Sequence, residues 1–334
     1  YDLQLSAAGM ASIGSNESAL PSVSAYGGSQ SDNIFLVNGV NTTNPRGAAF
    51  GSLVQVNYNN VQEVRVLSLG SKAEYGSFSG AAVDVITKSG SNEFHGDLAY
   101  FTTVGEGDRN QPCANCLGAD WLYIDPDDDL VTQPNERTEA NATLGGPIWR
   151  DRLWFHAGFA RYFTELWDPL RTTPESNDTD LYDLKLTAEI GRHHRAWIAY
   201  HHQDEVLSNV SWGDFWDETA VHEIARPNDT WSAQYQWVVS DRDIIGFKYL
   251  GFETDEQPTI TERYGRPCFS NWGTWAGPSL CVEGDFPFVN VMKSNRDTLQ
   301  ADFSHYAEDF LGSHDLKFGV QYTTANGDWM GGYF

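Results

Sequence analysis

Tyr182-Asp-Leu-Lys-Leu-Thr-Ala-Glu-Ile190 alternates apolar and polar side chains along its whole length. Successive side chains of a β-strand point to opposite faces, so this segment predicts a strand with one apolar and one polar face. The pattern recurs from about residue 91 onward. We expect nine strands, near residues 92–102, 136–147, 153–164, 180–191, 195–206, 229–239, 243–254, 295–306 and 314–325.

The connections between these strands alternate in length. Long connections follow the odd strands, at 103–135, 165–179, 207–228 and 255–294, whereas short ones follow the even strands. A transmembrane β-barrel has short turns on one side of the membrane and long loops on the other. We therefore favour a barrel over a soluble β-sandwich or β-propeller, which also show alternation. An odd strand count leaves an open edge that lipid does not tolerate, so we expect a truncated barrel.

The composition agrees with a membrane-exposed β-protein. The chain has 334 residues, a formal net charge of -25, and 12 Trp, 15 Tyr and 18 Phe. Trp and Tyr suit interfaces between apolar and aqueous surroundings. The acidic excess repels phosphate backbones, so we do not expect nucleic-acid binding. No run of 18 apolar residues is present, so we expect no transmembrane helix.

Residues 1–90 differ from the rest, because they are rich in Gly, Ser and Asn with only short apolar runs. They predict a small α+β domain whose strands are joined by glycine turns. We expect two domains: residues 1–90, truncated at the N-terminus, and residues 91–334, truncated at the C-terminus and holding the first nine or so barrel strands.

Several motifs in this order resemble one family. Asp32-Asn-Ile-Phe-Leu-Val-Asn-Gly-Val40, Val61-Gln-Glu-Val-Arg-Val-Leu67 and Ala73-Glu-Tyr-Gly-Ser-Phe-Ser-Gly-Ala-Ala-Val-Asp-Val-Ile-Thr-Lys88 resemble the plug domain of TonB-dependent outer-membrane transporters. Leu144-Gly-Gly-Pro-Ile-Trp-Arg-Asp-Arg-Leu-Trp-Phe155 and His314-Asp-Leu-Lys-Phe-Gly-Val320 are similar to barrel strands of the Oar-like subgroup. The turn departs from the family pattern, because Asn38 stands where Asp is common.

The resemblance implies a fold, a location and partners. A plug would fill a barrel in the bacterial outer membrane, in contact with outer-membrane lipid. TonB would pull on an N-terminal segment that this sequence lacks, to admit a scarce bulky nutrient such as a siderophore or a carbohydrate. Polar contacts would hold the plug in the lumen, with inward Lys185 and Glu189 among the wall groups. The plug motif residues would be Asn38, Gly39, Glu63, Arg65, Glu74, Tyr75, Gly76, Gly80 and Lys88.

Other residues suggest local sites in the long loops. The carboxylates of Asp125, Asp127, Asp128 and Asp129 are a candidate Ca²⁺ site, without the EF-hand order, or simply an acidic exposed loop. Loop aromatics could contact a ligand, pack the loops together or belong to an aromatic girdle; they are Trp212, Trp216, Trp272 and Trp275.

Pairs of cysteines and histidines also raise the question of metal sites. Cys113 and Cys116 lie far in sequence from Cys268 and Cys281, which disfavours one zinc site, so we favour two local disulfides. The pair His201-His202 invites a metal assignment, but adjacent strand residues point to opposite faces, so we expect no shared site.

No catalytic motif is present: the sequence has no Gly-x-Ser-x-Gly, no His-Glu-x-x-His and no phosphate-binding glycine loop. We therefore expect neither an enzyme nor a cofactor. Three functions remain: TonB-dependent uptake, a surface adhesion or secretion-linked protein of the same architecture, and a soluble β-sandwich carbohydrate-binding module.

Overall fold

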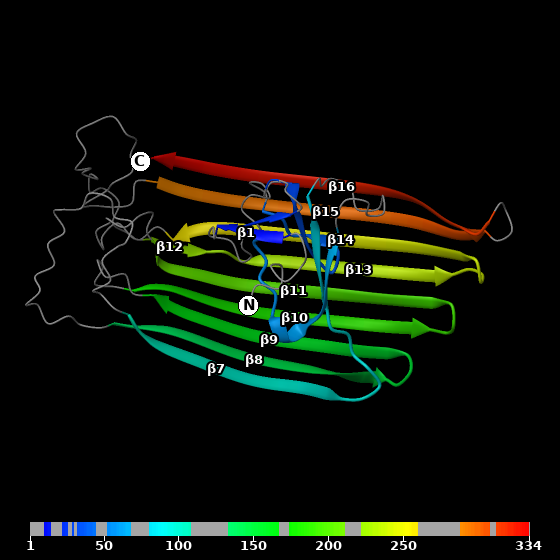
Figure 1. The fold of residues 1–334 in the computed structure, drawn as a ribbon, viewed down its shortest axis with the longest axis horizontal. Coiled ribbons are helices and arrows are strands. Elements are labelled where there is room, and N and C mark those ends of the chain that lie inside the picture. The colour runs from blue at the N-terminus through cyan, green and yellow to red at the C-terminus, as the bar shows by residue number, and fades with distance from the viewer. Residues whose placement is uncertain are drawn as a thin grey trace, which may run out of the picture.

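The fold is dominated by one long antiparallel sheet with a small sheet in front of it (Figure 1). The computed structural model describes residues 10–14, 22–25, 29, 32–44, 52–67, 80–107, 133–166, 174–210, 222–259, 288–307 and 312–333. No helix in these ranges is both long and apolar enough to cross a membrane.

The long sheet, here called the wall, contains ten strands in which neighbours in sequence are neighbours in space. They are β7 (His95–Gly107), β8 (Gln133–Trp149), β9 (Leu153–Leu166), β10 (Glu175–Ile190), β11 (His194–Val210), β12 (His222–Ala225), β13 (Asn228–Val238), β14 (Asp243–Thr259), β15 (Phe288–Ala307) and β16 (His314–Tyr333). The mainly β fold class and the nine expected strands are confirmed.

The wall differs from the expectation in one respect. The short strand β12 falls in a stretch expected to be a long connection, and with β13 it occupies a single place between β11 and β14. Arg226 and Pro227 separate the two strands. Because Pro has no backbone N–H, it cannot continue the hydrogen-bonded ladder, and it interrupts this strand.

The two faces of the wall invert the polarity of a soluble protein. On β10, Leu184 is 45% exposed, whereas the neighbouring Lys185 is only 7% exposed. The outward apolar side chains include Leu98, Tyr182, Ile198, Tyr200 and Phe247. The inward buried polar side chains include Asn141, Thr143, Asp183, His201, Gln203, Asn228, Thr230, Ser232 and Thr254.

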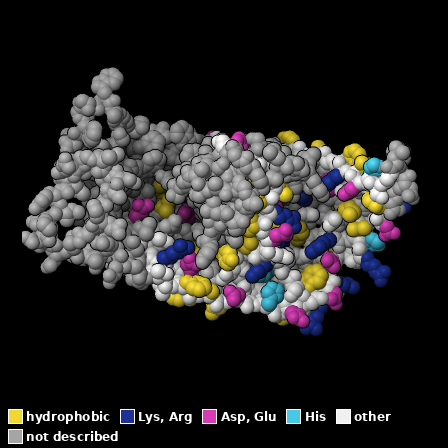
Figure 2. All heavy atoms as spheres, viewed as in Figure 1, with side chains coloured by type: hydrophobic (Ala, Val, Ile, Leu, Met, Phe, Trp, Pro, Cys, Tyr) yellow, Lys and Arg dark blue, Asp and Glu magenta, His cyan; other side chains and the backbone are white. Residues whose placement is uncertain are grey.

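This inversion decides between the fold alternatives. A soluble β-sandwich packs its apolar face against a second sheet. Here the apolar face points to the surroundings, and in the described residues the small sheet packs against the polar face instead. The soluble carbohydrate-binding module is therefore wrong, and the wall has the polarity of a membrane barrel. Figure 2, which shows the face that carries the small sheet, has charged side chains of both signs and histidines spread over it.

The small sheet, here called the plug sheet, contains β3 (Ile34–Val37), β4 (Val40–Asn41), β5 (Val61–Leu67) and β6 (Ala82–Thr87) in the order β4-β3-β6-β5. Strands β3 and β6 are parallel, and the other two pairs are antiparallel. A separate hairpin joins β1 (Met10–Gly14) to β2 (Ser22–Ala25). The expected α component is not found in the described residues, where the helical structure near the plug sheet is the 3-10 turn η3 (Tyr58–Asn60).

The apolar core lies between plug sheet and wall. Val37, Val40, Leu53 and Val54 pack against Phe252 of β14 and Met292 of β15. A smaller cluster on the same face of the plug sheet joins Phe35, Val83 and Val64. The division of the chain near residue 90 into two domains stays a prediction, because these contacts do not test whether either part folds alone.

Replacing Leu184 by Arg tests the lipid-facing assignment. An outward Arg near the middle of a barrel strand destabilises the folded state in a bilayer by about 2–4 kcal/mol. On an exposed face of a soluble sheet the same change stays within about 0.5 kcal/mol. Denaturant titration of the full-length protein in lipid vesicles measures the difference, and Leu184→Ala controls for the lost side chain. Equal stability of the two variants would contradict the assignment.

Gly90, which leads from the plug sheet into β7, approaches the wall too closely for a side chain. A Cβ there would collide with the Phe155 carbonyl oxygen and would lie 2.8 Å from the Phe155 nitrogen. We expect Gly90→Ala to destabilise the full-length protein by about 1–3 kcal/mol through overpacking. Gly327→Ala is the matched control, since its Cβ meets Ser294 only at 3.7 Å. Thermal melting in detergent compares the two, and indistinguishable midpoints would refute the collision.

Candidate functional site

The β3–β4 turn is a fixed point of the plug sheet. Asn38 and Gly39 have φ angles of 50° and 83°, the left-handed region that a two-residue Asn-Gly hairpin uses. The Asn38 Oδ1 accepts from the Thr87 backbone N–H and hydroxyl, each at 3.1 Å. The Asn38 Nδ2 donates to the Thr87 hydroxyl at 3.0 Å. A carboxylate has no such donor, so Asp at this position would lose one bond between the turn and β6.

Two carboxylates of the plug sheet lie beside this turn. Asp84 is buried and accepts from the Gly39 backbone N–H at 3.0 Å. Burial raises the pKa of the Asp84 carboxyl, and the bond from Gly39 opposes that rise. Glu63 on β5 is exposed and receives two hydrogen bonds of 3.0 Å from Arg65. These bonds lower the pKa of the Glu63 carboxyl.

Cationic wall residues bind the backbone of the plug region. The Lys185 Nζ donates to the Thr87 carbonyl at 2.8 Å, and the Arg296 Nη1 donates to the Asn41 carbonyl at 2.8 Å. Glu189, also expected to face the plug, lies 3.9 Å from Arg195 of the next wall strand. Lys88 is held through its backbone N–H, which donates to the Asn60 carbonyl at 2.8 Å.

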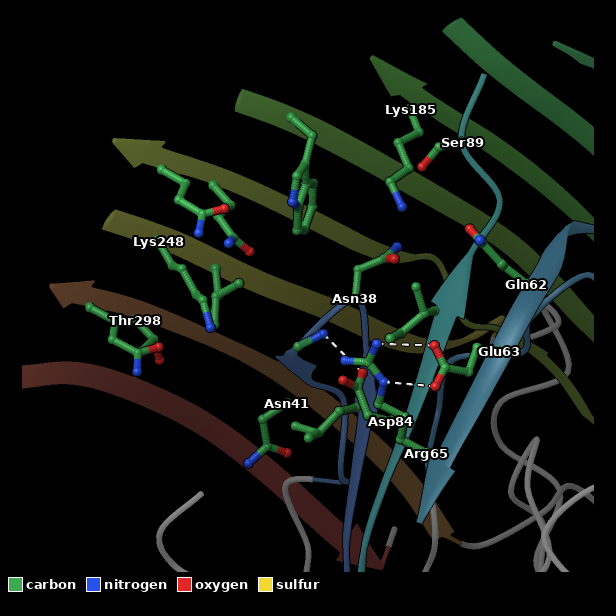
Figure 3. Close-up of a pocket in the computed structure, with 18 of the residues that line it drawn as sticks. Asn38, Asn41, Gln62, Glu63, Arg65, Asp84, Ser89, Lys185, Lys248 and Thr298 are labelled. Carbon is green, nitrogen blue, oxygen red and sulfur yellow. Dashed lines mark hydrogen bonds and ion pairs between the residues drawn. The ribbon is translucent and has the colours of Figure 1, made fainter. Parts of the chain in front are cut away.

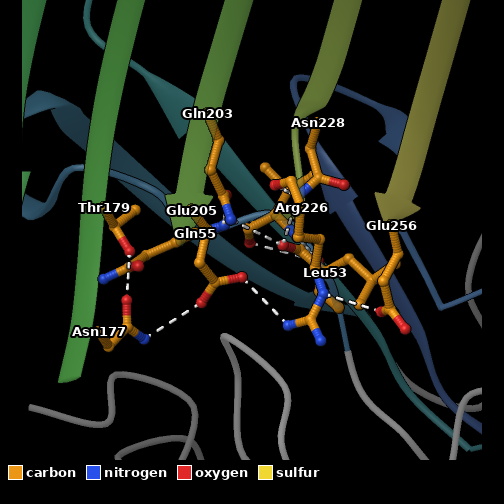
Figure 4. A network of polar contacts seen from close by, with 11 residues as sticks. Leu53, Gln55, Asn177, Thr179, Gln203, Glu205, Arg226, Asn228 and Glu256 are labelled. Atoms are coloured by element: carbon orange, nitrogen blue, oxygen red, sulfur yellow. Dashed lines mark hydrogen bonds and ion pairs between the residues drawn. The ribbon is translucent and has the colours of Figure 1, made fainter. Parts of the chain in front are cut away.

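Two wall amides fix the segment before η3, and together they are called the amide anchor (Figure 4). The Gln203 Oε1 accepts from the Gln55 backbone N–H at 2.7 Å, and its Nε2 donates to the Leu53 carbonyl at 3.3 Å. The Asn228 Nδ2 donates to the same carbonyl at 3.2 Å. Both side chains are fully buried. Their bonds satisfy backbone groups of the plug segment that lies against the wall.

A buried ion cluster braces the amide anchor. Arg226 lies between Glu205, at 3.1 Å, and Glu256, at 2.9 Å. All three side chains are less than a tenth exposed. Because Arg226 follows β12 directly, the cluster ties the strand break to β11 and β14.

A cavity of about 630 Å³ separates the plug sheet from the wall on the side of the short turns (Figure 3). Asn38, Asp84 and Arg65 border it from the plug sheet. Lys185, Lys248 and Arg296 border it from the wall. The amide anchor lies farther along the same strands, toward the long loops, as the position of Gln203 opposite Leu181 on β10 shows.

Many of the predicted site residues lie outside the described residues. These are Glu74, Tyr75 and Gly76 of the plug motif, the candidate Ca²⁺ ligands Asp125, Asp127, Asp128 and Asp129, the loop aromatics Trp212, Trp216, Trp272 and Trp275, and Cys113, Cys116, Cys268 and Cys281. Gly80 is described, and its N–H donates to the Asp32 carbonyl at 2.8 Å. A Cβ at Gly80 would collide with Asn33, so the plug motif needs glycine there.

The structure adds functional residues that the sequence did not single out: Gln203, Arg226, Asn228 and Arg296. Each is a polar residue on the inward face of a wall strand or at its break. Their inward position in the alternating pattern is the sequence feature that could have identified them. Within the described ranges, no three His, Cys, Asp or Glu side chains are grouped to hold a metal ion. His201 bonds Asp183 at 2.8 Å on the inward face, while His202 bonds Asp229 at 2.9 Å.

The chain is similar to known outer-membrane proteins in sequence and in fold. No family model matches the chain. The TonB-dependent transporter Oar of Myxococcus xanthus is 35% identical over 147 residues, which are 42% of this chain and 12% of Oar. The siderophore receptor PirA of Acinetobacter baumannii matches with a TM-score of 0.67 and 13% identity, covering 95% of this chain and 44% of PirA. The outer-membrane transporter YddB of Escherichia coli matches with a TM-score of 0.68 and 13% identity, covering 92% of this chain and 42% of YddB.

The matched proteins are all longer than this chain. The chain spans less than half of each of these proteins, and the structural likeness extends through both plug sheet and wall. The resemblance in the motifs is thereby confirmed: the chain is similar in sequence to a TonB-dependent transporter, Oar, and has the fold of outer-membrane siderophore receptors.

Proposed function

We propose that this chain forms the plug and part of the barrel of a TonB-dependent transporter, which takes up a scarce bulky nutrient across the bacterial outer membrane. The observation that carries the proposal is the plug sheet docked on the polar face of a wall whose other face is apolar. The relatives support the same function, since Oar is a TonB-dependent transporter and PirA a siderophore receptor.

The contacts between plug and wall suit a device that must open under force. A hydrogen bond adds about 0.5–1.5 kcal/mol net, so separate bonds can be broken one after another. In the described residues, most of the hydrogen bonds across this interface join wall side chains to plug backbone, as at Lys185, Gln203 and Arg296. In this proposal TonB pulls on a segment ahead of the plug, and the wall stays in place in the outer-membrane lipid. No covalent chemistry is involved, so we assign no enzymatic role.

The experiment that tests the proposal uses the full-length protein in its host. Outer-membrane fractionation with a heat-modifiability gel tests the closed barrel. Growth on limiting nutrients, with and without an intact tonB gene, tests energised uptake. We expect an outer-membrane protein with a heat-dependent mobility shift, and a growth defect on its deletion that matches the loss of TonB. A soluble protein would overturn the proposal. An outer-membrane protein whose deletion impairs surface adhesion or secretion, but not growth on any nutrient, would favour the alternative role.

The amide anchor makes a specific prediction about plug docking. Gln203→Met keeps the shape of the side chain but leaves the Gln55 N–H and one bond of the Leu53 carbonyl without a partner. An unsatisfied buried group costs about 1–3 kcal/mol. We therefore expect amide hydrogen exchange of residues 53–57 to speed up roughly 5- to 150-fold in the full-length protein in detergent.

Gln300→Met is the matched control. Gln300 is likewise an inward wall glutamine; it borders the cavity, and no hydrogen bond joins its side chain to the described part of the plug. Exchange in residues 53–57 should match the parent protein in this variant. Equal exchange in the Gln203 variant and the control would show that the amide anchor does not hold the plug.

A further inference from the structure

The cavity between plug sheet and wall has a charge opposite to that of the chain. Its border contains the two carboxylates Glu63 and Asp84. Against them stand five cationic side chains: Arg65, Lys185, Arg195, Lys248 and Arg296. The whole chain has 21 Lys and Arg against 46 Asp and Glu, so a cationic excess here is not a consequence of composition.

The local partners neutralise only part of this excess: Arg65 pairs with Glu63 at 3.0 Å, which leaves Asp84 against four cations. Lys185 and Arg296 donate to backbone carbonyls, which carry no net charge. Arg195 lies 3.9 Å from Glu189, at the edge of ion-pair range, and both side chains are about half exposed. Lys248 makes no hydrogen bond or ion pair with any residue that the structure describes. Figure 3 shows Lys185 and Lys248 extending from the wall strands toward the space between the wall and the plug sheet.

Neutral donors complete the lining. Asn38 of the plug sheet and Gln234, Gln300 and Thr298 of the wall also border the cavity. Amide and hydroxyl groups donate hydrogen bonds to carboxylate and phosphate oxygens, and charge-assisted bonds from Lys and Arg are stronger still. The volume of about 630 Å³ lies in the range of small-molecule sites, roughly 300–1,000 Å³.

Among the described residues, the buried cluster beside the amide anchor has the opposite balance. Around the amide anchor, Arg226 is the cation between two buried carboxylates, Glu205 and Glu256. A cleft lined by one sign of charge concentrates solutes of the other sign, and rings of Lys or Arg select anions in membrane pores. A solute moving from the long loops toward the short turns would pass from the acidic cluster to the cationic cavity.

We propose that this cavity is a binding site for a small multivalent anion, a solute with several carboxylate or phosphate groups, on the short-turn side of the plug. The site rests on the proposed function and narrows its substrate to the anionic class. Lys248 and Arg195 supply the least neutralised charges, while Lys185 and Arg296 hold the plug backbone and shape the border.

The test measures binding of two probes to the full-length protein in a non-ionic detergent at low ionic strength. Titration calorimetry with tricarballylate tests carboxylate recognition, and titration with inorganic pyrophosphate tests phosphate recognition. We expect at least one probe to bind, and to bind roughly tenfold more weakly in Lys248→Gln and in Arg195→Gln, because each removes one nearby charge. Added salt should weaken binding in the parent protein by screening.

Lys293→Gln is the control for charge alone. Lys293 lies toward the long loops on β15, away from the cavity, and bonds Asp255 at 3.3 Å. This variant should bind like the parent. Binding of neither probe to the parent, or equal affinity in all variants, would overturn the proposal. If one variant fails the heat-modifiability test of folding, the other still decides.

The test of the anion site and the test of the proposed function can fail independently of each other. An outer-membrane protein that supports TonB-dependent growth but binds neither anion would retain its function and lose this site. A protein that binds the anions through Lys248 and Arg195 but is not in the outer membrane would retain the site and lose the proposed function.

Discussion

Hydrogen bonding of the backbone in an apolar surrounding is the constraint on which the rest of this structure depends. A strand that faces hydrocarbon cannot give its N–H and C=O groups to water, so each must pair with a neighbouring strand. In the described residues, the ladder between β7 and β16 meets that demand for every inner strand. The backbone is then fully used, and the side chains decide which face is apolar and which is polar. Apolar side chains such as Leu184 take the outward face, and polar ones such as Lys185 must take the inward face. The plug sheet therefore docks on a polar surface.

In the proposed function, that polar surface would both hold the plug and let it leave under force. An apolar interface would resist separation over its whole area, whereas here the apolar contact is one small cluster around Phe252 and Met292. Most of the other hydrogen bonds between wall and plug in the described residues go to plug backbone, including those of the amide anchor. Because the wall binds mainly plug backbone, plug side chains such as Asp84 and Arg65 line the cavity.

The sequence predicted the wall better than the site because the two rest on different information. Alternation with period two is a local property, so the strands around Leu184 and Tyr235 could be placed within a few residues. Strand β12 was missed because a four-residue strand ahead of Arg226-Pro227 has no such period. The amide anchor joins residues 148 and 175 positions apart, and no local pattern reports such pairings. The alternation of side chains along a strand correctly predicted that His201 and His202 point to opposite faces. They bond different carboxylates.

The ion cluster at Arg226 lies at the strand break and joins the two wall strands on either side of it. Burying three charged groups is costly unless each is paired, and removing one partner leaves an uncompensated charge. Arg226 meets Glu205 of β11 and Glu256 of β14 at once because it lies opposite both of them: β12 and β13 keep one register with β11 and one register with β14 across Arg226 and Pro227. The Arg226 N–H still donates to the Glu205 carbonyl at 2.8 Å, whereas Pro227, which has no N–H, interrupts the strand after it. The interruption therefore leaves Arg226 in step with its neighbours, and its inward cation is paired on both sides.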